Sequence, residues 1–129
     1  MKIDTHLKID KRLCGTPTVV QKGYARVELT AIPEMAADES GLIHGGFIFG
    51  LADYAAMVAV NHPNVVLGAA EVKFLKPVAL DESVVAEARV DDTSGKKQIV
   101  KVTVARADRV VLEGVFTCFV LKKHVLAMI

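Results

Sequence analysis

Two hydrophobic patterns follow one another along the 129-residue chain. Residues 46–60 are almost continuously apolar until the NHPN segment at 61–64, which predicts one long helix buried on every side. Residues 23–31 alternate apolar and polar positions, as a half-buried strand does. Four further strands are predicted after residue 64, in the segments VVLGAAEVKFL, SVVAEARVDD, QIVKVTVARA and VVLEGVFTCFVLKK, with a hairpin turn at TSGK.

This order of elements predicts a fold class. One helix followed by consecutive strands is not an alternating βαβ pattern, so we expect an α+β domain in which an antiparallel sheet curls around the helix. The length fits a single domain over residues 1–129. Residues 1–14 fit either a short helix or an irregular strand, and residues 34–43 are loop-like.

The last predicted strand is apolar on both faces, which suggests that a second subunit covers one of them and that the chain forms homo-oligomers. One face carries Val110, Leu112 and Phe116, and the other carries Val111, Val115 and Phe119.

Charge and composition argue against several classes of partner. The net charge is only +1, which gives no electrostatic reason to expect nucleic acid or an acidic membrane surface, and no segment remains for a helix-turn-helix. The N-terminus lacks the apolar stretch of a secretory signal, so a cytoplasmic location is expected.

The run from Leu42 to Val60 is long enough to span a bilayer, but it contains His44 and Asp53, which favours a buried helix over a membrane span.

Asp53 is the most unusual residue in the predicted helix. Its neighbours one turn away, which are Phe49, Gly50, Ala56 and Met57, cannot pair with a charge. A buried carboxylate without a partner is costly, so Asp53 either pairs with a Lys or Arg from a strand or faces a cleft with a raised pKa. In the second case it is a candidate general base or nucleophile.

Gly45 and Gly46 precede this helix. Their backbone N–H groups, at the positive end of the helix dipole, suit an oxyanion that develops on a carbonyl, although the pair could also simply permit a tight turn. Asp53 lies eight residues beyond Gly45, a rise of about 12 Å along a helix. One small carbonyl cannot contact both groups of the same helix, so a shared substrate requires two copies of the chain with antiparallel helices.

The segment GLIHGGFIFGLADYAAM, with VKFLKPV downstream, resembles the hotdog-fold acyl-CoA thioesterases of the phenylacetic-acid-degradation (PaaI-like) type. The resemblance covers nearly the whole chain. It implies hydrolysis of a small or medium acyl-CoA, including aryl acyl groups, without a cofactor, in a homodimer or a dimer of dimers. It also implies that the Gly45 amide polarises the thioester carbonyl, that Asp53 of the neighbouring subunit activates water or attacks directly, and that His44 supports the turn or lines the site.

Two positions depart from the family pattern. Relatives often carry Asn where this chain has Asp38, and an ionised Asp accepts hydrogen bonds without donating any, so Asp38 could orient water but not hold the thioester oxygen. Relatives also place Ser or Thr on the strand after the helix, where this chain has Gly68, Ala69 and Ala70. Both departures bear on the acyl specificity.

The remaining candidates have simpler alternative explanations. Gly46, Phe47 and Tyr54 could contact the substrate, although aromatic residues on such a helix are usually core. The lysines that could bind CoA phosphates are Lys73, Lys76, Lys96, Lys97, Lys122 and Lys123, although lysines at strand ends are usually ordinary surface residues. His44 could equally be a hydrogen-bonded loop residue.

Other chemistries lack a matching motif. The four histidines (His6, His44, His62 and His124) show no metal-ligand spacing, and the two cysteines (Cys14 and Cys118) fit reduced thiols with no obvious base nearby. The catalytic-His signatures of hotdog dehydratases are not matched. A non-catalytic acyl-CoA binding module stays open as the alternative to hydrolysis.

Overall fold

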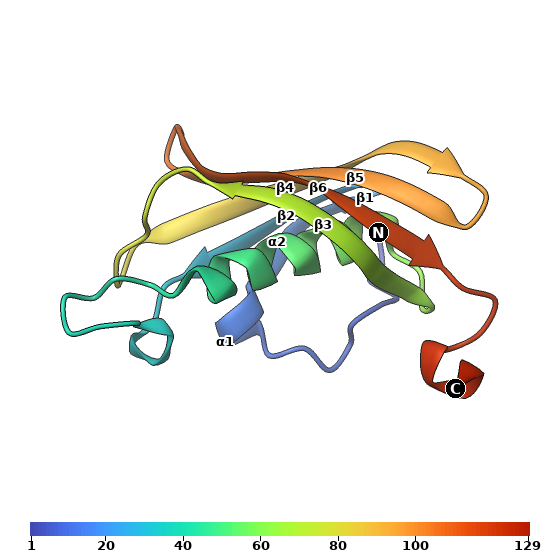
Figure 1. The fold of residues 1–129 in the computed structure, drawn as a ribbon, viewed down its shortest axis with the longest axis horizontal. Coiled ribbons are helices and arrows are strands. Elements are labelled where there is room, and N and C mark those ends of the chain that lie inside the picture. Colours follow the sequence, from blue (N-terminus) through green and yellow to red (C-terminus); the bar gives the residue numbers. More distant parts are fainter.

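In the computed structural model, which describes residues 1–129, a six-stranded antiparallel sheet wraps around one long helix (Figure 1). The strands lie in the order β1-β2-β4-β5-β6-β3. The elements in chain order are α1 (Lys11–Cys14), β1 (Thr16–Gln21), β2 (Tyr24–Thr30), the 3-10 turn η1 (Pro33–Met35), α2 (Gly45–Val60), β3 (Val65–Phe74), β4 (Ser83–Ser94), β5 (Lys97–Arg106), β6 (Arg109–Val120) and the 3-10 turn η2 (Val125–Met128).

The strands follow the alternation of apolar and polar residues. In β2, Ala25, Val27 and Leu29 are buried while the intervening side chains are exposed. The β4–β5 hairpin turns through Gly95, whose φ of 60° is easy for glycine and confirms the predicted TSGK turn. The inward side chains of β2, β4, β5 and β6 therefore share one core with the helix.

The helix α2 lies under the concave face of the sheet, and α1 covers it from the opposite side (Figure 1). Nine of its residues are buried, as a helix that is apolar all round requires. It ends where Asn61 takes a left-handed conformation and donates its backbone N–H to the Met57 carbonyl at 2.8 Å. None of the helices combines the length and the apolar character that a bilayer crossing needs.

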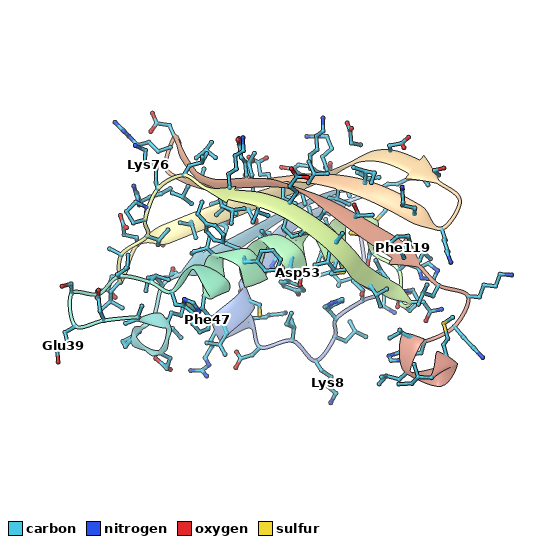
Figure 2. The ribbon with its side chains drawn as sticks, viewed as in Figure 1. Lys8, Glu39, Phe47, Asp53, Lys76 and Phe119 are labelled. Atoms are coloured by element: carbon cyan, nitrogen blue, oxygen red, sulfur yellow. The ribbon has the colours of Figure 1, made fainter.

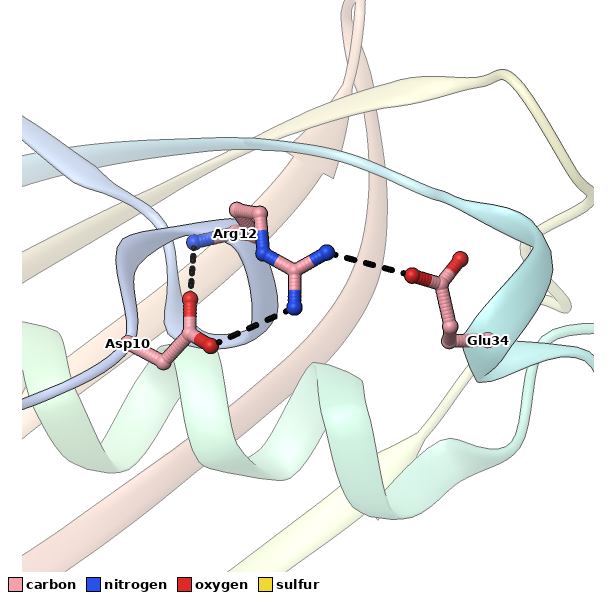
Figure 3. Close-up of polar contacts among 3 residues, drawn as sticks. All are labelled: Asp10, Arg12 and Glu34. Atoms are coloured by element: carbon pink, nitrogen blue, oxygen red, sulfur yellow. Dashed lines mark hydrogen bonds and ion pairs between the residues drawn. The ribbon is translucent and has the colours of Figure 1, made fainter.

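A small ion-pair chain joins α1 to the segment that leads toward α2. The guanidinium of Arg12 lies 3.5 Å from Asp10 and 3.2 Å from Glu34 of η1 (Figure 3). All three side chains are exposed, so each pair contributes roughly 1 kcal/mol at most. The contacts fix the position of α1 more than they stabilise the fold.

The predicted α+β class and the hotdog arrangement are confirmed, and two local features differ from expectation. Strand β1 was not predicted. It lies at the sheet edge, where a proline is tolerated, and its pairing with β2 has a register shift between Pro17 and Val19. Of residues 1–14, only Lys11–Cys14 form a helix.

The two apolar faces of β6 have different surroundings. Leu112 and Phe116 are fully buried against the helix, whereas Val115 on the other face is 40% exposed. At the end of the sheet, β3 pairs only with β6, so one whole edge of this ten-residue strand has no backbone partner within the chain. Gly68, Ala69 and Ala70 at its centre are exposed.

Candidate functional site

Asp53 occupies the middle of α2 (Figure 2) and has no counter-charge. One carboxylate oxygen, Oδ1, is buried without any hydrogen-bond partner, and the side chain takes part in no ion pair. Burial raises the pKa of Asp53 from 3.8 to about 6. The structure therefore rules out the alternative of an Asp neutralised by Lys or Arg from a strand of its own chain.

The two cysteines lie close enough to Asp53 for its charge to affect them. Burial, followed by the charges of Asp10 and Asp53, raises the pKa of the Cys14 thiol. Burial and then Asp53 raise the pKa of the Cys118 thiol to about 12. Both thiols are therefore protonated at neutral pH and poor nucleophiles, so the Asp53 carboxylate is the candidate among these three groups for chemistry.

The entry to α2 presents free backbone donors. His44 is the last extended residue, and the N–H groups of Gly45 and Gly46 hydrogen-bond neither to the backbone outside the helix nor to a side chain. As the first residues of the helix they also have no acceptor within it. Two amides at the positive end of the helix dipole can therefore hold a developing negative charge.

Crowding explains why both positions are glycine. Neither residue has a positive φ, so the turn itself does not demand glycine. A Cβ at Gly45 would lie 3.2 Å from the ring of Phe74, and one at Gly46 would lie 3.1 Å from the His44 imidazole. A side chain at either position would therefore crowd one of these two rings, and without one Gly45 is half-buried and Gly46 is exposed.

A mainly apolar hollow of about 320 Å³ opens beside Gly45. Phe74 and Leu75, which are 56% and 45% exposed, stand at the end of β3 and form part of its wall. Lys76 adds one cation to the rim. The other lining residues are Ile43, Ile48, Pro77, Val78 and Val111.

Several predicted residues surround the helix entry. The exposed His44 meets the Phe47 ring edge-on, with centroids 6.2 Å apart, and Lys76 lines the hollow beside Gly45. Asp38 has a local role, since its Oδ1 accepts the backbone N–H of Ser40 at 2.9 Å and of Leu42 at 3.1 Å. This Asx-type turn shapes the loop before the helix.

Tyr54 and Lys73 lie elsewhere. Tyr54 is 2% exposed and packs beside the His6 ring, with centroids 6.3 Å apart, so it belongs to the core. Lys73 lines a groove together with Glu71 of its own strand and Glu113 of the neighbouring β6. Sequence reasoning did not select Leu75, Ile48 or Val111 for the hollow, because isolated aliphatic residues carry no pattern that separates a wall from a core.

A sheet wrapped around one helix, with free amides at the helix entry and an unpaired acid two turns further on, defines a protein of the hotdog class. The family model described as the thioesterase superfamily matches residues 40–113, more than half of the chain and all of the helix. The chain belongs to the thioesterase superfamily.

Solved structures agree with this assignment. The uncharacterized protein PH1136 from Pyrococcus horikoshii is 56% identical, with a TM-score of 0.96 over 98% of this chain and 97% of that one. A variant of the phenylacetic acid degradation protein PaaI from Thermus thermophilus is 25% identical, with a TM-score of 0.77 over 84% of this chain and 95% of that one. The expected PaaI-like relationship is confirmed.

Two curated relatives are longer proteins. A methylthioribose-1-phosphate isomerase from Aquifex aeolicus is 52% identical over 116 residues, which are 90% of this chain and 25% of that protein. The transcription factor FapR from Shouchella clausii is 30% identical over 87 residues, 67% of this chain and 46% of that protein. The matched part of this chain thus spans about a quarter of the isomerase and about half of the transcription factor.

Proposed function

We propose that the protein is an acyl-CoA thioesterase that hydrolyses small or medium acyl-CoA, with aryl groups included. The observation that carries the proposal is the unpaired Asp53 carboxylate, whose pKa burial raises to about 6. A base with such a pKa is largely ionised at neutral pH and still takes up a proton readily. Family membership supplies the reaction class.

The site requires two copies of the chain. Gly45 and Asp53 are separated by about 12 Å of helical rise, too far for one carbonyl to contact both within a single helix. The open edge of β3 suits antiparallel pairing with a second β3, since its exposed residues 68–70 are small. A Cβ at Gly50, one turn before Asp53, would meet nothing within 4 Å, which leaves room there for a second helix.

In the proposed reaction, Asp53 of one copy takes a proton from water, and the resulting hydroxide attacks the thioester carbonyl. The Gly45 N–H of the second copy donates to the oxyanion that forms. The C–S bond then breaks, Asp53 returns the proton to the departing thiolate, and the products are a free acid and CoA. In the variant route, the Asp53 carboxylate attacks the thioester carbonyl, the C–S bond breaks and the CoA thiolate leaves with a proton from solvent. Water then cleaves the resulting anhydride at the Asp53 carboxyl carbon, which releases the free acid and restores Asp53.

One solved structure of the same fold holds a CoA thioester. The structure of smu.793 from Streptococcus mutans, which is 23% identical over 93% of this chain with a TM-score of 0.80, is bound to acetyl-CoA. At this identity the likeness concerns the fold alone. The hollow beside Gly45 is mainly apolar and carries one cation, a character that suits an acyl group attached to an anionic carrier.

A hydrolysis panel tests the proposal. The unaltered protein and the Asp53→Asn variant are assayed with aliphatic and aryl acyl-CoAs while free CoA thiol is detected. We expect turnover of at least one substrate and a loss of at least about 100-fold in the variant, the usual contribution of a positioned base. Asp108→Asn, at an exposed turn, is the matched control and should keep full activity.

A non-catalytic acyl-CoA binding module is the second candidate, because one relative is a transcription factor rather than a hydrolase. This candidate predicts that both the unaltered protein and Asp53→Asn bind acyl-CoA with similar affinity and hydrolyse none of the panel. That result would refute hydrolysis. Turnover that depends on Asp53 would refute the module.

A further inference from the structure

Three lysines surround a hollow of about 430 Å³ where β5 begins and β6 ends. Lys96 precedes β5, and Lys122 and Lys123 directly follow β6. None of the three takes part in an ion pair. By contrast, Lys101 of β5 pairs with Asp91 of β4 at 3.5 Å. Their positive charge is therefore uncompensated at this end of the sheet.

The walls of this hollow combine cations with apolar surface. The lysines share it with Val120 at the end of β6 and with Leu121 and Met128 of the segment that follows. Lysine ammonium groups bind phosphate as compact point charges, and an apolar wall can cover the face of a flat ring. This mixture suits a phosphorylated nucleotide better than an inorganic ion or an uncharged acyl chain.

The hollow lined by the three lysines lies next to the start of β3, and this position determines where it would lie in a dimer. Val120 pairs with Val65 at the start of β3, and the Leu121 N–H donates to the Asn64 carbonyl. The opposite end of β3 carries Phe74, whose ring lies over Gly45. Antiparallel pairing of two β3 edges brings the start of one β3 toward the end of the other. The lysine cluster of one copy then lies at the same end of the interface as Gly45 of the other.

We infer that Lys96, Lys122 and Lys123 bind the phosphates of a CoA thioester whose carbonyl lies at Gly45 of the second copy. The inference rests on the proposed function and deepens it, because it assigns the nucleotide end of the substrate to specific residues. Lys73, another of the six lysines considered from the sequence, has Glu71 and Glu113 beside it in its groove, which makes it a weaker anion ligand.

The test uses the full chain with Lys122 and Lys123 both replaced by Glu. The control is Lys8→Glu combined with Lys22→Glu, which changes the net charge equally at two exposed lysines without ion pairs. Calorimetry gives the dissociation constants for CoA and for pantetheine, which shares the thiol arm but lacks the nucleotide. Thermal unfolding verifies that both variants are folded.

We expect the Lys122/Lys123 variant to bind CoA at least tenfold more weakly and pantetheine with unchanged affinity, while the control stays within twofold for both. The loss should shrink as salt rises, because phosphate contacts are screened. CoA affinity equal to that of the control would overturn the inference, and so would an equal loss for CoA and pantetheine. Hydrolysis of acetyl-pantetheine by the unaltered protein tests the thioesterase proposal separately, since that thioester carries no nucleotide phosphates.

Discussion

Replacing Asp53 with Asn should stabilise the protein at neutral pH and leave its stability unchanged in acid. Asp53 pays a desolvation cost only when it is ionised, and Asn keeps nearly the same shape without a charge. The folded pKa of about 6 lies above the ordinary value of 3.8, so the folded state binds the proton more tightly than the unfolded chain does. The ionised acid therefore lowers the free energy of unfolding as pH rises from about 4 to above 6.

The size of this effect follows from the pKa shift. A rise from 3.8 to about 6 corresponds to a cost of about 3 kcal/mol for the fully ionised group. The side chain is only partly buried, so solvent reduces the cost, and we expect the variant to be more stable by about 1–3 kcal/mol near pH 8. At or below about pH 4 both the folded and the unfolded chain carry a protonated Asp53, and the difference should vanish.

Urea unfolding of both proteins at a series of pH values, at equal protein concentration, measures this difference. Asp108→Asn serves as the control, because its exposed carboxylate should give the same small change at every pH. If Asp53→Asn is destabilising near pH 8, or if its effect does not depend on pH, the carboxylate has a partner that compensates its charge. Asp53 would then be a charge-paired residue and not the proposed catalytic base.

Further predictions concern the reaction, the interface and the core. The kcat/KM for acyl-CoA should rise with pH through an apparent pKa of about 6 and level off above it, because only ionised Asp53 accepts a proton; a profile flat from about pH 5 to 8 would exclude this base. Single-turnover hydrolysis in ¹⁸O-water should label the product acid if Asp53 activates water, and should label Asp53 itself if it is the nucleophile. Gly50→Leu should weaken the dimer at least tenfold in sedimentation experiments, since the space open beside Gly50 is assigned to the second helix; an unchanged dimer constant would disprove that contact. Gly114→Ala should destabilise the fold by about 2 kcal/mol in urea titrations, because its Cβ would lie 2.5 Å from Val72 and 2.8 Å from the Glu71 carbonyl; a loss below about 0.5 kcal/mol would show that β3 moves away easily.

The sequence alone identified most of the elements and the candidate site residues. The continuous apolar run of residues 46–60 and the period of two in the later segments identify the helix and strands β3–β6, since local periodicity records which faces are buried. The same periodicity singles out Asp53, because it places this acid among apolar neighbours one helical turn away. For the proposed reaction, the distance between Gly45 and Asp53 along the helix also predicts a site shared by two chains.

Only the tertiary structure decided what surrounds these groups. It brought Phe74 over Gly45 and excluded a counter-ion for Asp53, contacts between residues far apart in the chain that no local pattern encodes. It also separated candidates that look equivalent in sequence: Tyr54 faces the core and Lys73 has acidic neighbours, whereas Lys76 lines the hollow beside Gly45. The physical reason is that periodicity reports whether a side chain is buried, while its neighbours depend on how strands pair and how the sheet closes over the helix.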